Sequence, residues 1–376
     1  MALIALPCQG KPVTPPLTLA YIATLLEQRR HIVRIYDLAL QPQVALEAAF
    51  QPLHSFKPNV VVVAGEHETQ IREAVDVLQQ NRRCATLPVQ MSRSGIDANY
   101  VAADVMAWID RQQHSEFATI LQTIDQLPHP ARHLLSLESY DPRAVGGELQ
   151  TPIVIAGVDA QSSKVVFRAP SQIIAELRAV SQEFGLRHYH FGEIPVTLDR
   201  AWLSELATRI SDARLGIGWE AIANADDLDD TLIASIAQSG CESLNFHLDA
   251  ARVFESTSAR STLVHVFATA RNCGIFVRAH VKLEPPYESV PALVDVAATF
   301  GLDDVRFDVA PSEAVSVGAD GVQLQAMARQ IYDAGRDRQR FIDRFGPALG
   351  NLLWKLRGPR SSPAPNLDKD DGLPVA

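Results

Sequence analysis

The chain has 376 residues, of which 47% are hydrophobic and 21% charged. This length predicts two or three domains of roughly 100 to 200 residues and excludes a small fold held by disulfides. The 34 basic and 44 acidic residues give a net charge of −10, which argues against a nucleic-acid partner. Since no apolar run reaches the roughly 18 residues of a membrane span and the start lacks a basic leader, we expect no membrane partner and a cytoplasmic location.

The first 125 residues predict an open α/β domain. Short apolar strands alternate with helical patterns, and residues 59–64 (NVVVVA) are typical of a strand that is buried on both faces. This alternation indicates a doubly wound, Rossmann-like sheet over residues 1–125. The predicted strands are 2–6, 32–36, 59–64 and 87–91, and the predicted helices include 18–28 and 69–80.

Prolines and glycines interrupt the pattern over residues 126–150, which we interpret as an interdomain linker. Six strand–helix units follow within 151–330 and predict a parallel partial (β/α)6 barrel. Residues 331–357 predict C-terminal helices, and the Pro, Ser and Asp content of 358–376 predicts a disordered tail. The predicted barrel strands are 153–156, 187–191, 215–219, 243–248, 275–282 and 305–309.

Several of these strands alternate apolar and polar residues. Because side chains alternate between the two faces of a strand, the apolar set packs under the helices and the polar set faces the barrel interior. Burial without a partner costs about 1–3 kcal/mol for each polar group, so these groups either pair with one another or surround a polar ligand. The polar set comprises His188 and His190, then Asn245 and His247, then Arg278, His280 and Lys282, and finally Arg306 and Asp308.

Two interpretations leave the barrel without an organic ligand. Internal ion pairs would join Arg278 to Glu220 or Arg306 to Asp308. A metal ion is the other possibility, bound by the histidines of three strands with one carboxylate, although their spacing is nonlocal. Its ligands would be His190, His247, His280 and Asp308.

A third interpretation is a ligand site at the carboxyl ends of the strands, where parallel barrels place their chemistry. Arg278, Lys282 and Arg306 would bind the carboxylate or phosphate of a small anionic metabolite. His247 or His280 would then act as the general base. We take this interpretation as the leading one.

Five segments carry a resemblance to a known family. They are residues 15–38 (PPLTLAYIATLLEQRRHIVRIYDL), 127–140 (LPHPARHLLSLESY), 167–177 (FRAPSQIIAEL), 191–199 (FGEIPVTLD) and 236–246 (IAQSGCESLNF). In order and spacing they resemble the cobalamin-binding radical S-adenosylmethionine (SAM) proteins, over roughly residues 1–350. The resemblance implies a Rossmann-like domain that holds cobalamin against a six-unit partial barrel, which carries a [4Fe-4S] cluster and SAM.

The cluster motif of that family is missing. The resemblance implies C-x-x-x-C-x-x-C after the first barrel strand, but IAGVDAQSSKVVFRAPS has Val158, Ser162 and Val165 at the three positions. Iron–sulfur clusters need thiolate ligands, so we predict no [4Fe-4S] cluster and no radical chemistry. The cysteines are scattered and form no C-x-x-C pair; they are Cys8, Cys84, Cys241 and Cys273.

The cobalamin motifs are also changed. In the family a GG-x-HA turn and a GEGE segment face the cofactor, where glycine allows close approach. Here residues 92–95 read SRSG and residues 110–114 read DRQQH. The D-x-H-x-x-G motif is absent, and His67 is better explained as a loop residue than as an axial ligand. We therefore expect cobalamin less than SAM as a cofactor of this chain.

Part of the SAM site is retained. Gly192 and Glu193 resemble the family's GGE-like segment, in which the carboxylate meets the ammonium of SAM. Glu193 is equally suited to be an N-terminal charge for the next helix. Glu284 and Pro286 replace glycines near the adenine site implied by the resemblance. The expected cofactor-binding set is Gly192, Glu193, Asn245, Arg306 and Asp308, with no resident metal.

Two functions follow. The first is a cluster-free, radical-SAM-like transferase or lyase of specialised-metabolite biosynthesis, which uses polar chemistry on an anionic substrate, with SAM or cobalamin as methyl carrier. Its catalytic residues would be His247, His280, Arg278 and Lys282. The second is a noncatalytic partner subunit of an active cobalamin-dependent radical SAM enzyme. The retained polar residues favour the first function, and the lost motifs favour the second.

Overall fold

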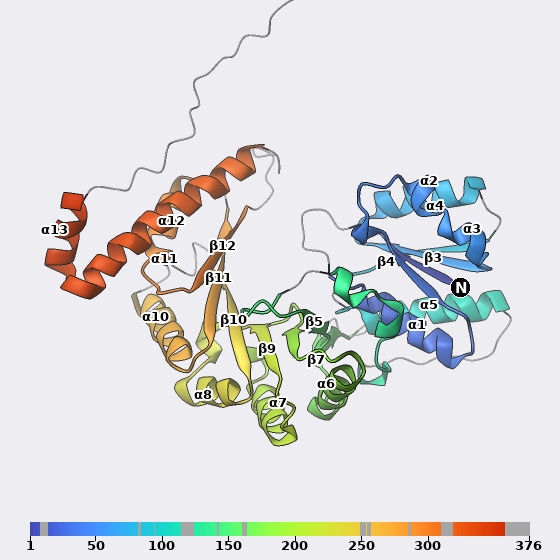
Figure 1. The fold of residues 1–376 in the computed structure, drawn as a ribbon, viewed down its shortest axis with the longest axis horizontal. Helices are drawn as coiled ribbons and strands as arrows, with labels where there is room; N and C mark the ends of the chain where they lie inside the picture. Colours follow the sequence, from blue (N-terminus) through green and yellow to red (C-terminus); the bar gives the residue numbers. More distant parts are fainter. Residues whose placement is uncertain are drawn as a thin grey trace, which may run out of the picture. The chain divides into compact units, whose positions relative to one another are not determined.

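The computed structural model describes residues 1–7, 14–81, 84–93, 95–113, 124–140, 143–159, 164–248, 253, 257–284, 287–309 and 319–357. The chain divides into two compact units, each described by itself (Figure 1). Unit 1 comprises Met1–Phe246 and Ala268–Arg278, and unit 2 comprises His247–Phe267 and Ala279–Ala376. Strands and helices alternate along the chain, which confirms the predicted α/β class. The predicted tail, 358–376, lies outside the described residues.

Unit 1 begins with a four-stranded parallel sheet in the order β2-β1-β3-β4. Helices cover both faces, as Figure 1 shows, so the strands need apolar residues on both sides. On β1, Leu3 packs in the same core as α1 and α5, while Ile4 packs with α3 and α4. The bounds are β1 Ala2–Ala5, α1 Leu17–Gln28, β2 Arg34–Asp37, η1 Leu38–Leu40, α2 Leu46–Ala49, α3 Pro52–Phe56, β3 Val60–Gly65, α4 Glu68–Asn81, β4 Ala85–Gln90 and α5 Ala98–Gln113.

A six-stranded sheet follows in the order β12-β11-β10-β9-β8-β5, as the predicted partial barrel requires. Gly185 and Gly240 follow α6 and α8 at φ 69° and 93°, the left-handed conformation that ends helices. The strands are β5 Gln150–Ile153, β8 His188–Phe191, β9 Gly218–Ile222, β10 Cys241–Leu248, β11 Phe276–Leu283 and β12 Asp304–Val309. The helices are α6 Pro170–Phe184, η5 Val196–Leu198, α7 Arg200–Ala213, η6 Ala225–Asp227, α8 Asp230–Gln238, α10 Thr257–Asn272, η7 Tyr287–Ser289 and α11 Val290–Ala297.

The segment predicted as a linker is packed. It forms short 3-10 turns, and Arg132, Leu137 and Tyr140 are buried. Proline and glycine correctly marked the loss of regular structure, but they do not report burial, and the apolar residues between them anchor the segment. The turns are η2 Ile124–Gln126, η3 Arg132–Leu134 and η4 Leu137–Ser139.

Other details differ from the sequence prediction. An antiparallel hairpin, β6 Ala156–Val158 and β7 Val165–Phe167, follows β5. In unit 2, α12 spans Ala319–Phe345 and therefore begins within the range predicted as barrel; α13 spans Pro347–Arg357. Among the described residues, we find no helix with the length and apolar character of a membrane span.

Candidate functional site

The predicted alternation is present on the barrel strands. Val277, Ala279 and Val281 of β11 are buried, whereas Arg278 and His280 between them are partly accessible. β8, β10 and β12 show related patterns, although Asn245 of β10 is itself buried. The polar side chains therefore share the strand face that was predicted to line the interior.

In unit 1 the polar cluster centres on Glu220 of β9. Its Oε1 lies 3.1 Å from Nδ1 of His190, and its Oε2 lies 3.9 Å from Nη1 of Arg278. Burial acts to raise the pKa of Glu220, but the hydrogen bond from His190 and the charges of His190 and Arg278 hold it below the ordinary value. The pairing of Arg278 with Glu220 that the sequence suggested is therefore present, at a distance too long for a hydrogen bond.

Two side chains of β10 extend this cluster. Ser243 lies opposite Glu220 in the parallel register, and Asn245 follows two residues later on the same face. Both are buried, and neither Ser243 Oγ nor Asn245 Oδ1 has a hydrogen-bond partner among the described residues. Sequence reasoning selected Asn245 but missed Ser243, although the same period of two identifies both.

In unit 2 the cluster contains His247, His280 and Asp308. His280 Nδ1 lies 3.2 Å from Asp308 Oδ2, and the rings of His247 and His280 lie 5.4 Å apart. Burial, followed by the neighbouring His280, lowers the pKa of His247. The hydrogen bond with His280 lowers the pKa of Asp308, although burial opposes it. This arrangement combines an imidazole oriented by a carboxylate with a second imidazole that is neutral near pH 7.

The remaining basic residues do not form a cluster of unpaired charge. Lys282 Nζ lies 2.5 Å from Oε1 of Glu284, and Arg306 is exposed near Asp308, whose pKa its charge helps to lower. Carboxylates therefore accompany the cations of these strands. No group of three or more potential metal ligands occurs among the described residues, so the metal interpretation gains no support.

The residues at the family's cluster positions do not fit an iron–sulfur cluster. Val158 and Val165 are directly paired across the β6–β7 hairpin, and Ser162 lies outside the described residues. Valine offers no donor atom, and in the described part Cys84, Cys241 and Cys273 are all far from this hairpin in sequence. Burial also raises the pKa of the Cys241 thiol, which disfavours the thiolate that iron needs.

The edge of the first sheet does not fit cobalamin either. Arg93 stands where the family has a glycine, and its buried guanidinium donates to the carbonyl oxygens of Thr14 and Leu6 and to Asp37. Tyr140 donates to Asp37 at 2.8 Å. These side chains fill space at the carboxyl ends of β1 and β2, where glycine would leave room for a bulky ligand. His67 is exposed, as a loop residue would be.

The proposed SAM residues at the end of β8 are partly consistent with their role. Gly192 adopts φ 59°, and Glu193 after it is exposed, so its carboxylate can meet an ammonium. The alternative role of Glu193 was an N-terminal charge for the next helix. At the start of α7 a carboxylate is already supplied by Asp199, which caps the helix and accepts from the backbone N–H of Trp202. Glu284 is paired with Lys282, and Pro286 lies outside the described residues.

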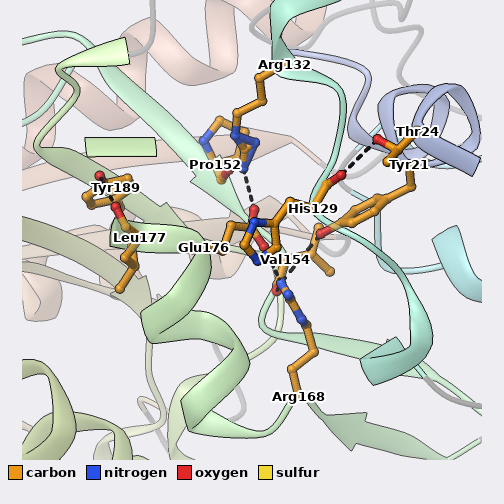
Figure 2. A network of polar contacts seen from close by, with 10 residues as sticks. All are labelled: Tyr21, Thr24, His129, Arg132, Pro152, Val154, Arg168, Glu176, Leu177 and Tyr189. Carbon is orange, nitrogen blue, oxygen red and sulfur yellow. Dashed lines mark hydrogen bonds and ion pairs between the residues drawn. The ribbon is translucent and has the colours of Figure 1, made fainter. Parts of the chain in front are cut away.

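A buried ionic network was not predicted at all (Figure 2). Glu176 of α6 accepts from Arg132 and Arg168, at 2.8 Å and 2.7 Å, and Arg168 also lies 3.5 Å from the hydroxyl of Tyr21. The two arginines hold the pKa of Glu176 below its ordinary value against the effect of burial. The network joins α1, the predicted linker and the start of α6, so it has a structural role within unit 1.

Comparisons with known proteins agree with this geometry at the level of fold. No family model and no curated protein matches the chain. A structure of the radical SAM methyltransferase TsrM from Kitasatospora setae, with cobalamin and a [4Fe-4S] cluster bound, aligns over 82% of this chain and 71% of that one, with a TM-score of 0.60 and 12% identity. This chain shares its fold with TsrM.

A second structure of TsrM, with tryptophan substrate and the SAM analogue aza-SAM bound, gives a TM-score of 0.58 and 13% identity. It covers 82% of this chain and 72% of TsrM. Identities this low establish the shared radical SAM fold and no more. The fold implied by the sequence resemblance is therefore confirmed, whereas the chemistry depends on the residues of this chain.

Proposed function

We propose that this chain is a radical-SAM-fold enzyme that catalyses cluster-independent, polar chemistry on a small molecule in its barrel. The observation that carries the proposal is the arrangement of Asp308, His280 and His247. Asp308 orients His280, and His247 carries an unprotonated ring nitrogen near pH 7. Such a pair can remove a proton from a substrate at one position and return it at another. Transferase or lyase chemistry of specialised metabolism is consistent with this capacity.

We further propose that the residues at the end of β8 bind a methyl donor. Glu193 would bind the ammonium of SAM, while Gly192 allows the backbone to approach the ligand. SAM supplies an electrophilic methyl group: the lone pair of a nucleophilic substrate atom forms the new bond to carbon while the methyl–sulfur bond breaks, and S-adenosylhomocysteine leaves without any radical.

The test uses the purified protein in air, without iron, sulfide or reductant. A small-molecule extract of the producing cells is incubated with the protein and SAM, and mass spectrometry follows which compounds are consumed. We expect consumption by the wild type and its loss in His280→Gln. His188→Gln is the matched control, because His188 is also a strand histidine paired with a carboxylate, Glu242, at 2.9 Å. Turnover that requires iron, sulfide and a reductant would overturn the proposal.

A noncatalytic partner role is the second candidate. It is supported by three leucines of α13 that are exposed at helical spacing, Leu349, Leu352 and Leu356. Such a row on a surface helix suits contact with another protein. If this role holds, native mass spectrometry with a cluster-bearing radical SAM enzyme of the same cell should show a complex that Leu352→Glu abolishes. A stable monomer under these conditions would argue against it.

A further inference from the structure

Two buried hydrogen-bond acceptors on one strand of the barrel interior of unit 1 have no donor among the described residues. Asn245 and Ser243 are 5% and 0% exposed, and Asn245 Oδ1 and Ser243 Oγ lack partners in the described part of the chain. Leaving such groups unpaired costs about 1–3 kcal/mol each. Proteins accept this cost where a ligand or an ordered water completes the hydrogen bonds.

The same strand face carries one negative and one positive side chain. Glu220 lies opposite Ser243 in register, and Arg278 lies 3.9 Å from Glu220. Both charged side chains keep some solvent access, with exposed fractions of 11% and 18%. A ligand that entered from solvent would therefore meet both charges, with the unpaired oxygens beside the carboxylate.

A simple anion or cation is a poor match for this cluster. Glu220 and Arg278 carry opposite charges, and His190 hydrogen-bonds to Glu220, so a ligand with a single charge would add an uncompensated charge to a partly buried site. A zwitterion brings both signs and leaves the balance unchanged. The cationic end of the ligand must also carry several N–H groups, because a single donor cannot satisfy the acceptor atoms of Asn245, Ser243 and Glu220 together.

We propose that the barrel interior of unit 1 binds the ammonium and carboxylate groups of a free α-amino acid. The ammonium donates to Asn245 Oδ1, Ser243 Oγ and the Glu220 carboxylate, and the amino acid's carboxylate pairs with Arg278. This inference rests on the proposed function only in placing the small-molecule ligand inside the barrel. It refines the expected anionic metabolite by adding an ammonium next to the acid.

The test measures binding, so it needs no turnover. Thermal shift with each standard L-amino acid at millimolar concentration selects the best ligand, and isothermal titration calorimetry then compares it with two analogues. One analogue lacks the amino group and the other lacks the carboxyl group. We expect each analogue to bind about tenfold more weakly or worse, because each leaves one charged residue and its hydrogen bonds uncompensated.

Variants locate the ligand. Asn245→Leu removes the unpaired acceptor at similar volume and should weaken binding about tenfold or more while the protein stays folded. Thr151→Val is the matched control: Thr151 Oγ1 is also buried and unpartnered among the described residues, but Thr151 pairs in register with Tyr189, whose hydroxyl contacts α6. It therefore belongs to the helix-covered face and should not affect binding.

Four results would overturn the inference. They are no shift with any amino acid, equal affinity for the analogue without an amino group, equal loss of affinity in Thr151→Val and Asn245→Leu, and binding by SAM alone. The first result would leave water as the partner of Asn245, and the last would make the site a cofactor site. Failure of the proposed function would look different, because amino-acid binding would then persist while turnover either required iron, sulfide and a reductant or survived in His280→Gln.

Discussion

Val158 and Val165 are direct cross-strand partners in the hairpin that follows the first barrel strand. These are two of the three positions at which the family resemblance requires cysteine. The pairing places both positions in regular β structure, and neither side chain carries a thiol.

This relationship predicts that the protein assembles no iron–sulfur cluster. After anaerobic reconstitution with iron and sulfide, we expect iron well below four atoms per chain and no cluster absorption band. Elemental analysis and visible spectroscopy measure both quantities. Stoichiometric four-iron content that depends on the existing cysteines would contradict the prediction.

Glu176 should be essential for stability. Glu176→Gln removes the buried charge that compensates Arg132 and Arg168, so two guanidinium groups remain in a site with almost no solvent access. Breaking a buried network in this way costs about 3–5 kcal/mol. Urea denaturation at neutral pH should show the loss. Glu205→Gln is the control, because its pair with Arg209 is exposed and should contribute less than about 1 kcal/mol.

Arg278→Met should destabilise the protein less than Glu176→Gln does. Glu220 loses a partner at 3.9 Å but keeps its hydrogen bond with His190 and some access to water. We expect the fold to survive with a loss well below the roughly 3–5 kcal/mol of a stranded buried charge, while amino-acid binding is lost. A loss as large as that of Glu176→Gln would show that Arg278 is mainly structural and would favour the partner-subunit role.

His247 should titrate below the ordinary histidine value of 6.5. Because its folded pKa is lowered, its contribution to stability is complete above about pH 6.5 and is lost as pH falls through the folded pKa. NMR titration of the ring protons measures this pKa. His280→Ala should raise it, since the charge of His280 is one of its two lowering influences. An unchanged pKa of His247 in that variant would show that the two rings do not interact electrostatically.

Deletion of residues 358–376 should leave the folded core unaffected. The segment is rich in proline, serine and aspartate and has few residues to bury. The thermal midpoint should stay within about one or two degrees of the full chain, as for any segment outside the cooperative core. Differential scanning calorimetry of both forms measures the thermal midpoint. A midpoint lower by many degrees in the shortened chain would mean that residues 358–376 pack against the folded core.

Local pattern was sufficient for several features of this protein. The period of two in β11 separated Val277 and Val281 from Arg278 and His280 correctly, because a strand alternates its side chains whatever surrounds it. Asp199 and Gly185 lie at helix ends for equally local reasons, a side-chain cap and a left-handed backbone. The order of strands and helices followed from such signals.

Tertiary structure alone decided which polar groups meet. Arg132 comes from the predicted linker, whereas Arg168 lies just before α6 and Glu176 within it, and nothing in the sequence around Arg132 indicates that it joins the other two. The unpartnered Oδ1 of Asn245 is likewise a property of its surroundings. It has no hydrogen bond because no donor of the other described residues comes within reach. Periodicity assigns a side chain to a face, whereas pairing, burial and pKa depend on distances that only the packed chain sets.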